Sequence, residues 1–152
     1  MATANYTSFM DAALALAETA LTVGEIPVGA VVVQSGKIVG RGHNRTRIDQ
    51  DPTAHAEIVA IREATRFLDN DRLEDCDLWV TLEPCTMCAG AIAHARVGRL
   101  YYGASDVKGG AVDSGVRFFD SPTCHHRPEV YSGMEEEISA KLLTGFCRGR
   151  RN

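Results

Sequence analysis

The sequence predicts an α/β domain of three layers (α/β/α), in which helices cover both faces of a mixed sheet of about five strands. The length of 152 residues fits one domain, so a single domain is expected over 1–152. Two strand-like runs around a short turn predict an antiparallel hairpin in the first half. In the second half, strand-like runs alternate with segments of helical periodicity, which predicts parallel pairing with helices on both faces.

The first elements are a helix and the two strands of the hairpin. Apolar residues recur at helical spacing over 7–22, and Gly24 ends the expected helix. A β-branched run predicts the first strand at 28–33. The second strand is expected at 37–42, after a turn at Ser35-Gly36.

The next helix is expected over 55–68, because Asp51-Pro52-Thr53 provides the signals of a helix start. Its buried side is expected to consist of Ile58, Val59, Ile61 and Ala64. The later elements are expected as a strand at 77–82, a helix rich in small residues at 84–94, strands at 97–102 and 129–131, and a helix at 134–146. The segment 103–128 has no clear pattern, and long irregular segments of compact domains are usually functional.

Composition and charge narrow the class of protein. Apolar residues make up 45% and charged residues 24%, the balance of a soluble protein. No run approaches the roughly 18 apolar residues that a membrane helix needs. Residues 1–9 contain no basic residue of a secretory signal, so a cytoplasmic location is expected. The net charge of −4 argues mildly against a nucleic-acid partner, although arginines gather at 148–151.

Four residues at two expected helix starts carry metal chemistry. Cys85 and Cys88 are three apart, so their sulfurs share a helix face, and the helix dipole favours thiolates there. His55 and Glu57 are two apart, and they converge only if a metal lies beyond the end of their helix. Two thiolates and one imidazole favour zinc, and a zinc ion with three protein ligands keeps its fourth position open for water.

This ligand set predicts hydrolytic chemistry. Zinc with two thiolates and a neutral imidazole is formally neutral, and zinc lowers the pKa of a bound water to about 7. Glu57 is the expected acceptor of the proton. It is expected to shuttle that proton to the leaving group while zinc-bound hydroxide attacks an electrophilic carbon.

Two other interpretations of the same residues stay open at this point. The five cysteines and the lack of a secretory signal argue against a disulfide framework, but Cys85 and Cys88 could be a redox pair. A structural zinc site would need a fourth ligand, and the candidates are Cys76, Cys124, His43, His94 and His125. That interpretation leaves Glu57 without a role. Otherwise Cys76 and Cys147 are expected to be inert, and His94 to be a helix-end or core histidine.

The motif pair His-x-Glu and Pro-Cys-x-x-Cys resembles the zinc-dependent cytidine and adenosine deaminase superfamily. Four stretches, 25–31, 51–57, 80–90 and 102–106, look like the bacterial tRNA-specific adenosine deaminases within it. The similarity runs over nearly the whole chain. The resemblance implies a cytidine-deaminase-like fold.

The resemblance implies a role for each matching residue. His55, Cys85 and Cys88 bind one zinc ion per subunit, and Glu57 shuttles protons. The implied substrate contacts are Asn44 on the target base, Val28 and Ala56 lining the base pocket, Pro84 at the start of the second zinc helix, Asp106 facing the ribose-phosphate backbone, and His125, His126 and Arg127 facing the anticodon.

Some of these assignments have plainer alternatives. The family often has asparagine where this chain has His125, although an imidazole can still hydrogen-bond to a base or stack on it. His125 and His126 could instead be a solvated loop pair. Asn44 could be a turn residue.

The resemblance implies hydrolytic deamination of the wobble adenosine of a tRNA anticodon to inosine. The implied partners are the tRNA anticodon stem-loop and a second copy of the chain, packed through the helix 88–94 and the segment after Asp106. Two other functions stay open. One is a free-nucleobase deaminase of the same fold, acting on guanine or cytosine, which has no need of Asp106 or of the terminal arginines. The other is a non-catalytic, zinc-stabilised binding module.

Overall fold

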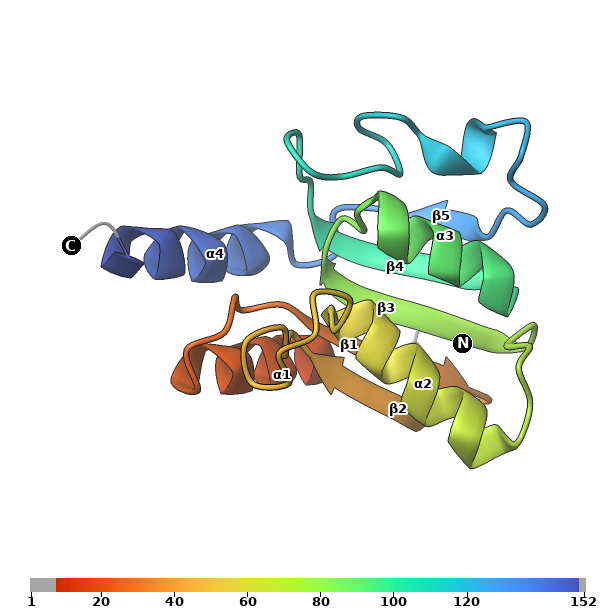
Figure 1. Ribbon diagram of the computed structural model, residues 1–152, viewed down its shortest axis with the longest axis horizontal. Helices are drawn as coiled ribbons and strands as arrows, with labels where there is room; N and C mark the ends of the chain where they lie inside the picture. Colours follow the sequence, from red (N-terminus) through yellow and green to blue (C-terminus); the bar gives the residue numbers. More distant parts are fainter. Residues whose placement is uncertain (1–7, 151–152) are drawn as a thin grey trace, which may run out of the picture.

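The computed structural model describes residues 8–150, without the side chains of 147–150, and shows three layers (Figure 1). Five strands form one sheet in the order β2-β1-β3-β4-β5. β1 pairs antiparallel with β2 and β3, whereas β4 pairs parallel with β3 and β5. The predicted hairpin and the predicted parallel pairing are confirmed. The strands are β1 Gly29–Gln34, β2 Lys37–His43, β3 Cys76–Leu82, β4 Arg99–Ala104 and β5 Glu129–Tyr131.

Helices cover both faces of this sheet. α2 and α3 pack on one face and α1 packs on the other, together with Leu142 of α4. The inner strand β1 is therefore buried on both sides, with Ala30 and Val32 toward α2 and Val31 and Val33 toward α1. None of the helices within residues 8–150 is long and apolar enough to span a membrane. The helices are α1 Met10–Thr22, α2 Ala56–Leu68, α3 Thr86–Ala95, the 3-10 helix η2 Phe118–Asp120, and α4 Glu136–Arg150.

Several boundaries differ from the expected ones for local reasons. α1 begins at Met10, later than the expected start at residue 7, which lies outside the described residues. β4 begins two residues later than expected, because Arg96 ends α3 in the left-handed conformation (φ 61°) and Val97 is buried in the core before pairing starts. Likewise α4 begins after Glu135, whose φ is 57°, and then extends beyond the expected end. The unassigned segment 103–128 contains η2.

Small residues bring α2 close to β2. Ala56, Ala60 and Ala64 of α2 are fully buried. They lie over Gly40 and Gly42 of β2. A Cβ atom at Gly42 would lie 2.5 Å from the carbonyl oxygen of Ala56, and one at Gly40 would lie 2.4 Å from that of Ala60. The position of the first turn of α2 therefore depends on glycine in β2.

The alanine contact also corrects the expected buried side of α2. Ala64 is buried as expected, but Ile58, Val59 and Ile61 are only partly buried. Glycine in β2 leaves room for a methyl group and no more, so the larger side chains lie at the sides of the contact. Ile61 nevertheless packs against the core. The expectation for Ile58 and Val59 was wrong because it rested on hydrophobicity and did not consider the space beneath the helix.

We predict that Gly42→Ala destabilises the protein by about 1–3 kcal/mol, because the added methyl group overlaps the backbone of α2. The measurement is the free energy of unfolding in urea with zinc present. Gly145→Ala is the matched control, since a Cβ there meets nothing within 4 Å and alanine favours a helix over glycine by up to about 1 kcal/mol. Equal stability of the two variants would contradict the close packing of α2 on β2.

Candidate metal centre and cavity

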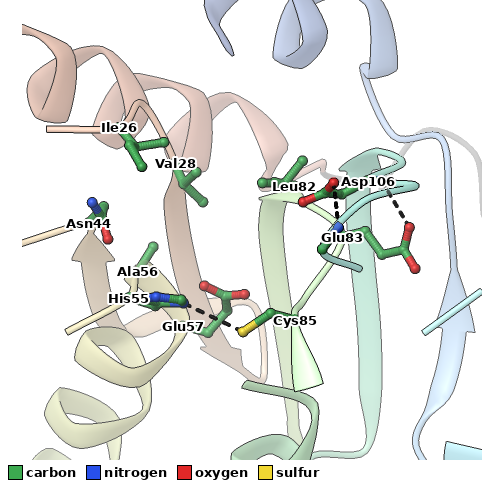
Figure 2. Close-up of a pocket in the computed structure, with 11 residues that line it drawn as sticks. Ile26, Val28, Asn44, His55, Ala56, Glu57, Leu82, Glu83, Cys85 and Asp106 are labelled. Carbon is green, nitrogen blue, oxygen red and sulfur yellow. Dashed lines mark hydrogen bonds between the residues drawn. The ribbon is translucent and has the colours of Figure 1, made fainter. Parts of the chain in front are cut away.

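The first turns of α2 and α3 meet at one edge of the sheet (Figure 2). His55 is the N-cap residue of α2, with φ −74° and ψ 157°, and Cys85 is the N-cap residue of α3, with φ −75° and ψ 176°. Both residues are extended, so their side chains project beyond the helix ends. Cys88 lies in the first turn of α3 and is fully buried. The metal therefore fits beyond the start of α2, the condition under which His55 and Glu57 can face the same point.

The distances at this point fit a zinc ion. The His55 Nδ1 atom lies 3.6 Å from the Cys85 Sγ atom and 3.5 Å from the Cys88 Sγ atom. The three ligand atoms all lie within 4.8 Å of one another. Ordinary zinc–nitrogen and zinc–sulfur bonds that meet at a tetrahedral angle separate the two ligand atoms by about 3.6 Å. The three side chains are therefore already spaced for zinc.

The charges of the protein groups favour one thiolate at this centre. A hydrogen bond from Cys88, with a further one from His55, lowers the pKa of the Cys85 thiol to about 4. The same hydrogen bond to Cys85, together with burial, raises the pKa of the Cys88 thiol. Because a divalent cation deprotonates the thiols that coordinate it, metal binding releases the proton of Cys88.

Glu57 lies beside the metal centre and is not one of its ligand candidates. It occupies the first turn of α2, and its side chain is 4% exposed. Burial, with the negative charge of Cys85, raises the pKa of the Glu57 carboxyl to about 7. A carboxyl group with this pKa can accept and release a proton near neutral pH.

A cavity of about 150 Å³ opens next to the centre. Val28, Asn44, Ala56 and Asp106 line it, so four of the eight expected substrate contacts meet around His55, Glu57 and Cys85 (Figure 2). The Asn44 amide is 5% exposed and donates a hydrogen bond of 3.2 Å to Glu25, whose side chain is fully buried. The side chain of Asn44 is thus held at the cavity.

The other four expected contacts lie outside this lining. Pro84 directly precedes Cys85, and its carbonyl oxygen accepts a hydrogen bond from Ala111. The His126 Nε2 atom donates a 2.7 Å hydrogen bond to the Val97 carbonyl oxygen.

Arg127 forms an ion pair of 2.6 Å with Asp120. His125 belongs to the same loop, which leads into β5 at Glu129. Glu129 pairs with Arg99, at the end of β4 that lies away from Asp106. The structure therefore does not bring His125, His126 or Arg127 to the cavity of the same chain.

Sequence reasoning missed four residues of the lining: Ile26, Leu82, Glu83 and Gly109. It also missed Glu25, which holds Asn44. A signal for the two glutamates exists in the sequence. Glu25 and Glu83 each stand next to an apolar residue and within two residues of a proline. A carboxylate that is buried in such an apolar segment requires hydrogen-bond donors.

The geometry is that of a known family. The chain matches the model of the cytidine and deoxycytidylate deaminase zinc-binding region over residues 3–104. It is 57% identical, over 148 residues, to the tRNA-specific adenosine deaminase of Agrobacterium fabrum, and the match covers 97% of each chain. The chain belongs to the tRNA-specific adenosine deaminase family.

Solved structures of this deaminase superfamily share the fold. One comes from a study of A-to-I editing by tRNA:A34 deaminases at the wobble position of transfer RNA. It has a TM-score of 0.88 and 58% identity, over 89% of this chain and 98% of that chain. Another is the guanine deaminase of Bacillus subtilis, with a TM-score of 0.65 and 34% identity, over 97% of this chain and 95% of that chain. The predicted resemblance and the predicted α/β fold are confirmed.

Membership of the deaminase family and the spacing of His55, Cys85 and Cys88 together identify zinc as the cofactor, one ion per chain. The candidates for a fourth protein ligand do not join this group among the side chains that the structure describes. Cys76 is buried, and burial raises the pKa of its thiol to about 11, whereas the thiol of Cys124 donates to a backbone carbonyl. The side chain of Cys147 lies outside the described residues.

We predict that Cys88→Ser and His55→Gln each reduce the zinc content from one ion per chain to a small fraction of that value. Each substitution removes one of three ligands, and no described side chain of the right type is close enough to replace it. Zinc is measured by mass spectrometry of the purified protein after dialysis. Cys124→Ser is the matched control and keeps its zinc. Full zinc content in Cys88→Ser, or loss of zinc in Cys124→Ser, would overturn this ligand set.

Proposed function

We propose that the chain is a single-domain enzyme that hydrolytically deaminates the wobble adenosine of a tRNA anticodon to inosine. The observation that supports this most is one cavity that combines the zinc ligands, the buried Glu57 and the polar side chains of Asn44 and Asp106. The identity of 57–58% to a tRNA-specific adenosine deaminase and to a structure from a study of tRNA:A34 deaminases supports the choice of substrate. The anticodon loop already presents unstacked bases, so placing one of them in a closed cavity costs little.

Glu57 is the proposed proton shuttle. Zinc, when bound by His55, Cys85 and Cys88, supplies Lewis-acid activation of a water molecule. Glu57 accepts the proton of that water and delivers it to the leaving amino group, so that water and adenosine give inosine and ammonia. Its pKa of about 7 suits it to both transfers.

The cavity lining holds the base in the proposed complex. Val28 and Ala56 provide apolar contacts to the ring, and Asn44 provides a polar contact, with its orientation held by Glu25. Asp106 faces the ribose-phosphate backbone at the mouth of the cavity. Pro84 acts through the backbone, since it sets the start of α3 at Cys85.

His125, His126 and Arg127 are proposed to contact RNA outside the cavity. The six residues of β4 span about 16 Å, which separates their loop from the base bound in the same chain. In a homodimer, the same loop is free to meet RNA that is bound to the other subunit.

A cytoplasmic location belongs to the same proposal, because the proposed substrate is a cytoplasmic RNA. We also propose a homodimer, which two exposed regions of the surface support. Gly90 of α3 has open space where a Cβ would lie, and Met87 of the same helix is 37% exposed. Val107 and Val116, after Asp106, are 82% and 67% exposed. These apolar and small side chains support the expected contact between two copies.

A free-nucleobase deaminase is the second candidate. Similarity to the guanine deaminase of Bacillus subtilis favours it, but at 34% identity this similarity is well below that to the tRNA-specific enzymes. A non-catalytic zinc module is the weakest candidate, because it leaves a buried carboxyl group of raised pKa beside the ligands without a purpose.

We predict that the zinc-loaded protein releases ammonia from an anticodon stem-loop with a wobble adenosine, and does not act on free guanine, cytosine or adenine. Glu57→Gln is expected to lower the rate by about 10²–10⁴-fold, because the amide cannot carry the proton. Inosine is measured by mass spectrometry of the digested RNA.

The control for this experiment is Glu63→Gln on the exposed side of α2, which is expected to keep full activity and its zinc. Deamination of a free base without action on the stem-loop would replace the first candidate by the second. Full activity of Glu57→Gln would remove Glu57 from the mechanism.

A further inference from the structure

Glu83 is a buried carboxylate that the mechanism above does not use. It lies between the end of β3 and the metal ligand Cys85, and its side chain is 2% exposed. Its two oxygens accept five hydrogen bonds, all from one loop, residues 106–114. The donors to Oε1 are the backbone of Asp106 at 3.0 Å and the hydroxyl of Ser114 at 2.9 Å, and the donors to Oε2 are the backbones of Val112, Asp113 and Ser114 at 3.1, 3.0 and 2.9 Å.

All five groups that face the two Glu83 oxygens are hydrogen-bond donors, which is the arrangement that an ionised carboxylate requires. An ionised carboxylate accepts hydrogen bonds and donates none, and each of its bonds is stronger than one between neutral groups. The donors of the loop therefore stabilise the buried negative charge of Glu83, which would otherwise need a cation beside it.

The loop 106–114 fits closely around this carboxylate. A Cβ atom at Gly110 would lie 2.5 Å from the Glu83 Cδ atom, so only glycine allows the backbone to pass there. Gly110 also forms a β-bridge with Cys85, and Ala111 donates to the carbonyl oxygen of Pro84 at 2.9 Å. Glu83 thus joins the loop to the same segment that carries the metal ligand.

Part of this loop lines the cavity. Asp106 and Gly109 are both lining residues. The Asp106 Oδ1 atom accepts hydrogen bonds from the backbones of Lys108 at 3.2 Å and Gly109 at 3.0 Å, which fixes the direction of the Asp106 carboxylate. The backbone N–H of Asp106 is in turn held by Glu83. A change at Glu83 therefore reaches the substrate through Asp106.

We propose that Glu83 is a positioning residue for the nucleotide: it anchors the loop 106–114 and so sets the affinity for the RNA around the target base, while leaving the chemical step to zinc and Glu57. This inference rests on the proposed function. Glu83 belongs to the cavity lining, but both of its carboxylate oxygens are engaged by the loop, so its effect passes through the position of Asp106 and Gly109.

Glu83→Gln tests the proposal with little change of shape. A glutamine offers one oxygen and one NH₂ group, so in either orientation at least one backbone N–H of the loop faces a second donor. We expect KM for the anticodon stem-loop to rise about tenfold, because a buried donor is left without an acceptor and the loop shifts. We expect kcat to change by less than about twofold and the zinc content to stay at one per chain.

One further measurement and two further variants keep the result interpretable. Hydrogen exchange of the amides of 106–114 is expected to become faster in Glu83→Gln, because Glu83 protects them. Ser114→Ala removes a single hydrogen bond to Oε1 and is expected to raise KM by a smaller factor, which gives a second variant if the glutamine protein does not fold. Glu74→Gln is the matched control, an exposed glutamate in the turn before β3, and is expected to behave as the wild type.

Unchanged KM and unchanged amide exchange in Glu83→Gln would overturn the proposal. So would a loss of zinc and of kcat in both Glu83→Gln and Ser114→Ala, because Glu83 would then serve the metal centre. If the wild type does not act on the stem-loop, the proposed function fails by itself. In that event amide exchange still decides whether Glu83 anchors the loop.

Discussion

The contact of His55 with the sulfurs of Cys85 and Cys88 joins the first turns of two helices at one edge of the sheet. Each helix is placed by a different constraint. α3 follows β3 directly, so the central sheet fixes its start, whereas α2 reaches the same edge because Gly40 and Gly42 let it lie close to β2. Since the ligand atoms must stand within a few tenths of an ångström of tetrahedral spacing, the packing of both helices is part of the metal centre.

The proposed mechanism assigns separate tasks to separate groups around the centre. His55, Glu57 and Cys85 line the cavity and are proposed to serve the chemical step. Around them, two buried carboxylates hold parts of the cavity lining: Glu25 holds Asn44, and Glu83 holds the loop that carries Asp106. Both carboxylates take donors from loops, as buried charges must have partners.

Much of this arrangement could be predicted from the sequence. The three-residue spacing of Cys85 and Cys88 predicts that their sulfurs share a helix face, because helix geometry is local. That His55 and Glu57 face the same point was expected only on the condition that a metal lies beyond the end of their helix. The partly buried Ile58 and the anchoring role of Glu83 could not be found in this way. Burial depends on what lies beneath a helix, and the partners of Glu83 are 23 to 31 residues away. Likewise, the sequence predicts a functional loop at 125–127. It does not predict that this loop lies at the end of β4 that is away from the cavity.

X-ray absorption at the zinc edge tests the central claim, a zinc ion with three protein ligands and an open fourth position, most directly. Such a zinc ion is expected to show two sulfur ligands at about 2.3 Å and two nitrogen or oxygen ligands at about 2.0–2.1 Å, one of them the His55 imidazole. Addition of a thiolate inhibitor is expected to convert the spectrum to three sulfur ligands, because the fourth position is exchangeable. Three sulfur ligands in the protein alone, or a spectrum that the inhibitor does not change, would contradict an open fourth position and indicate a closed structural site.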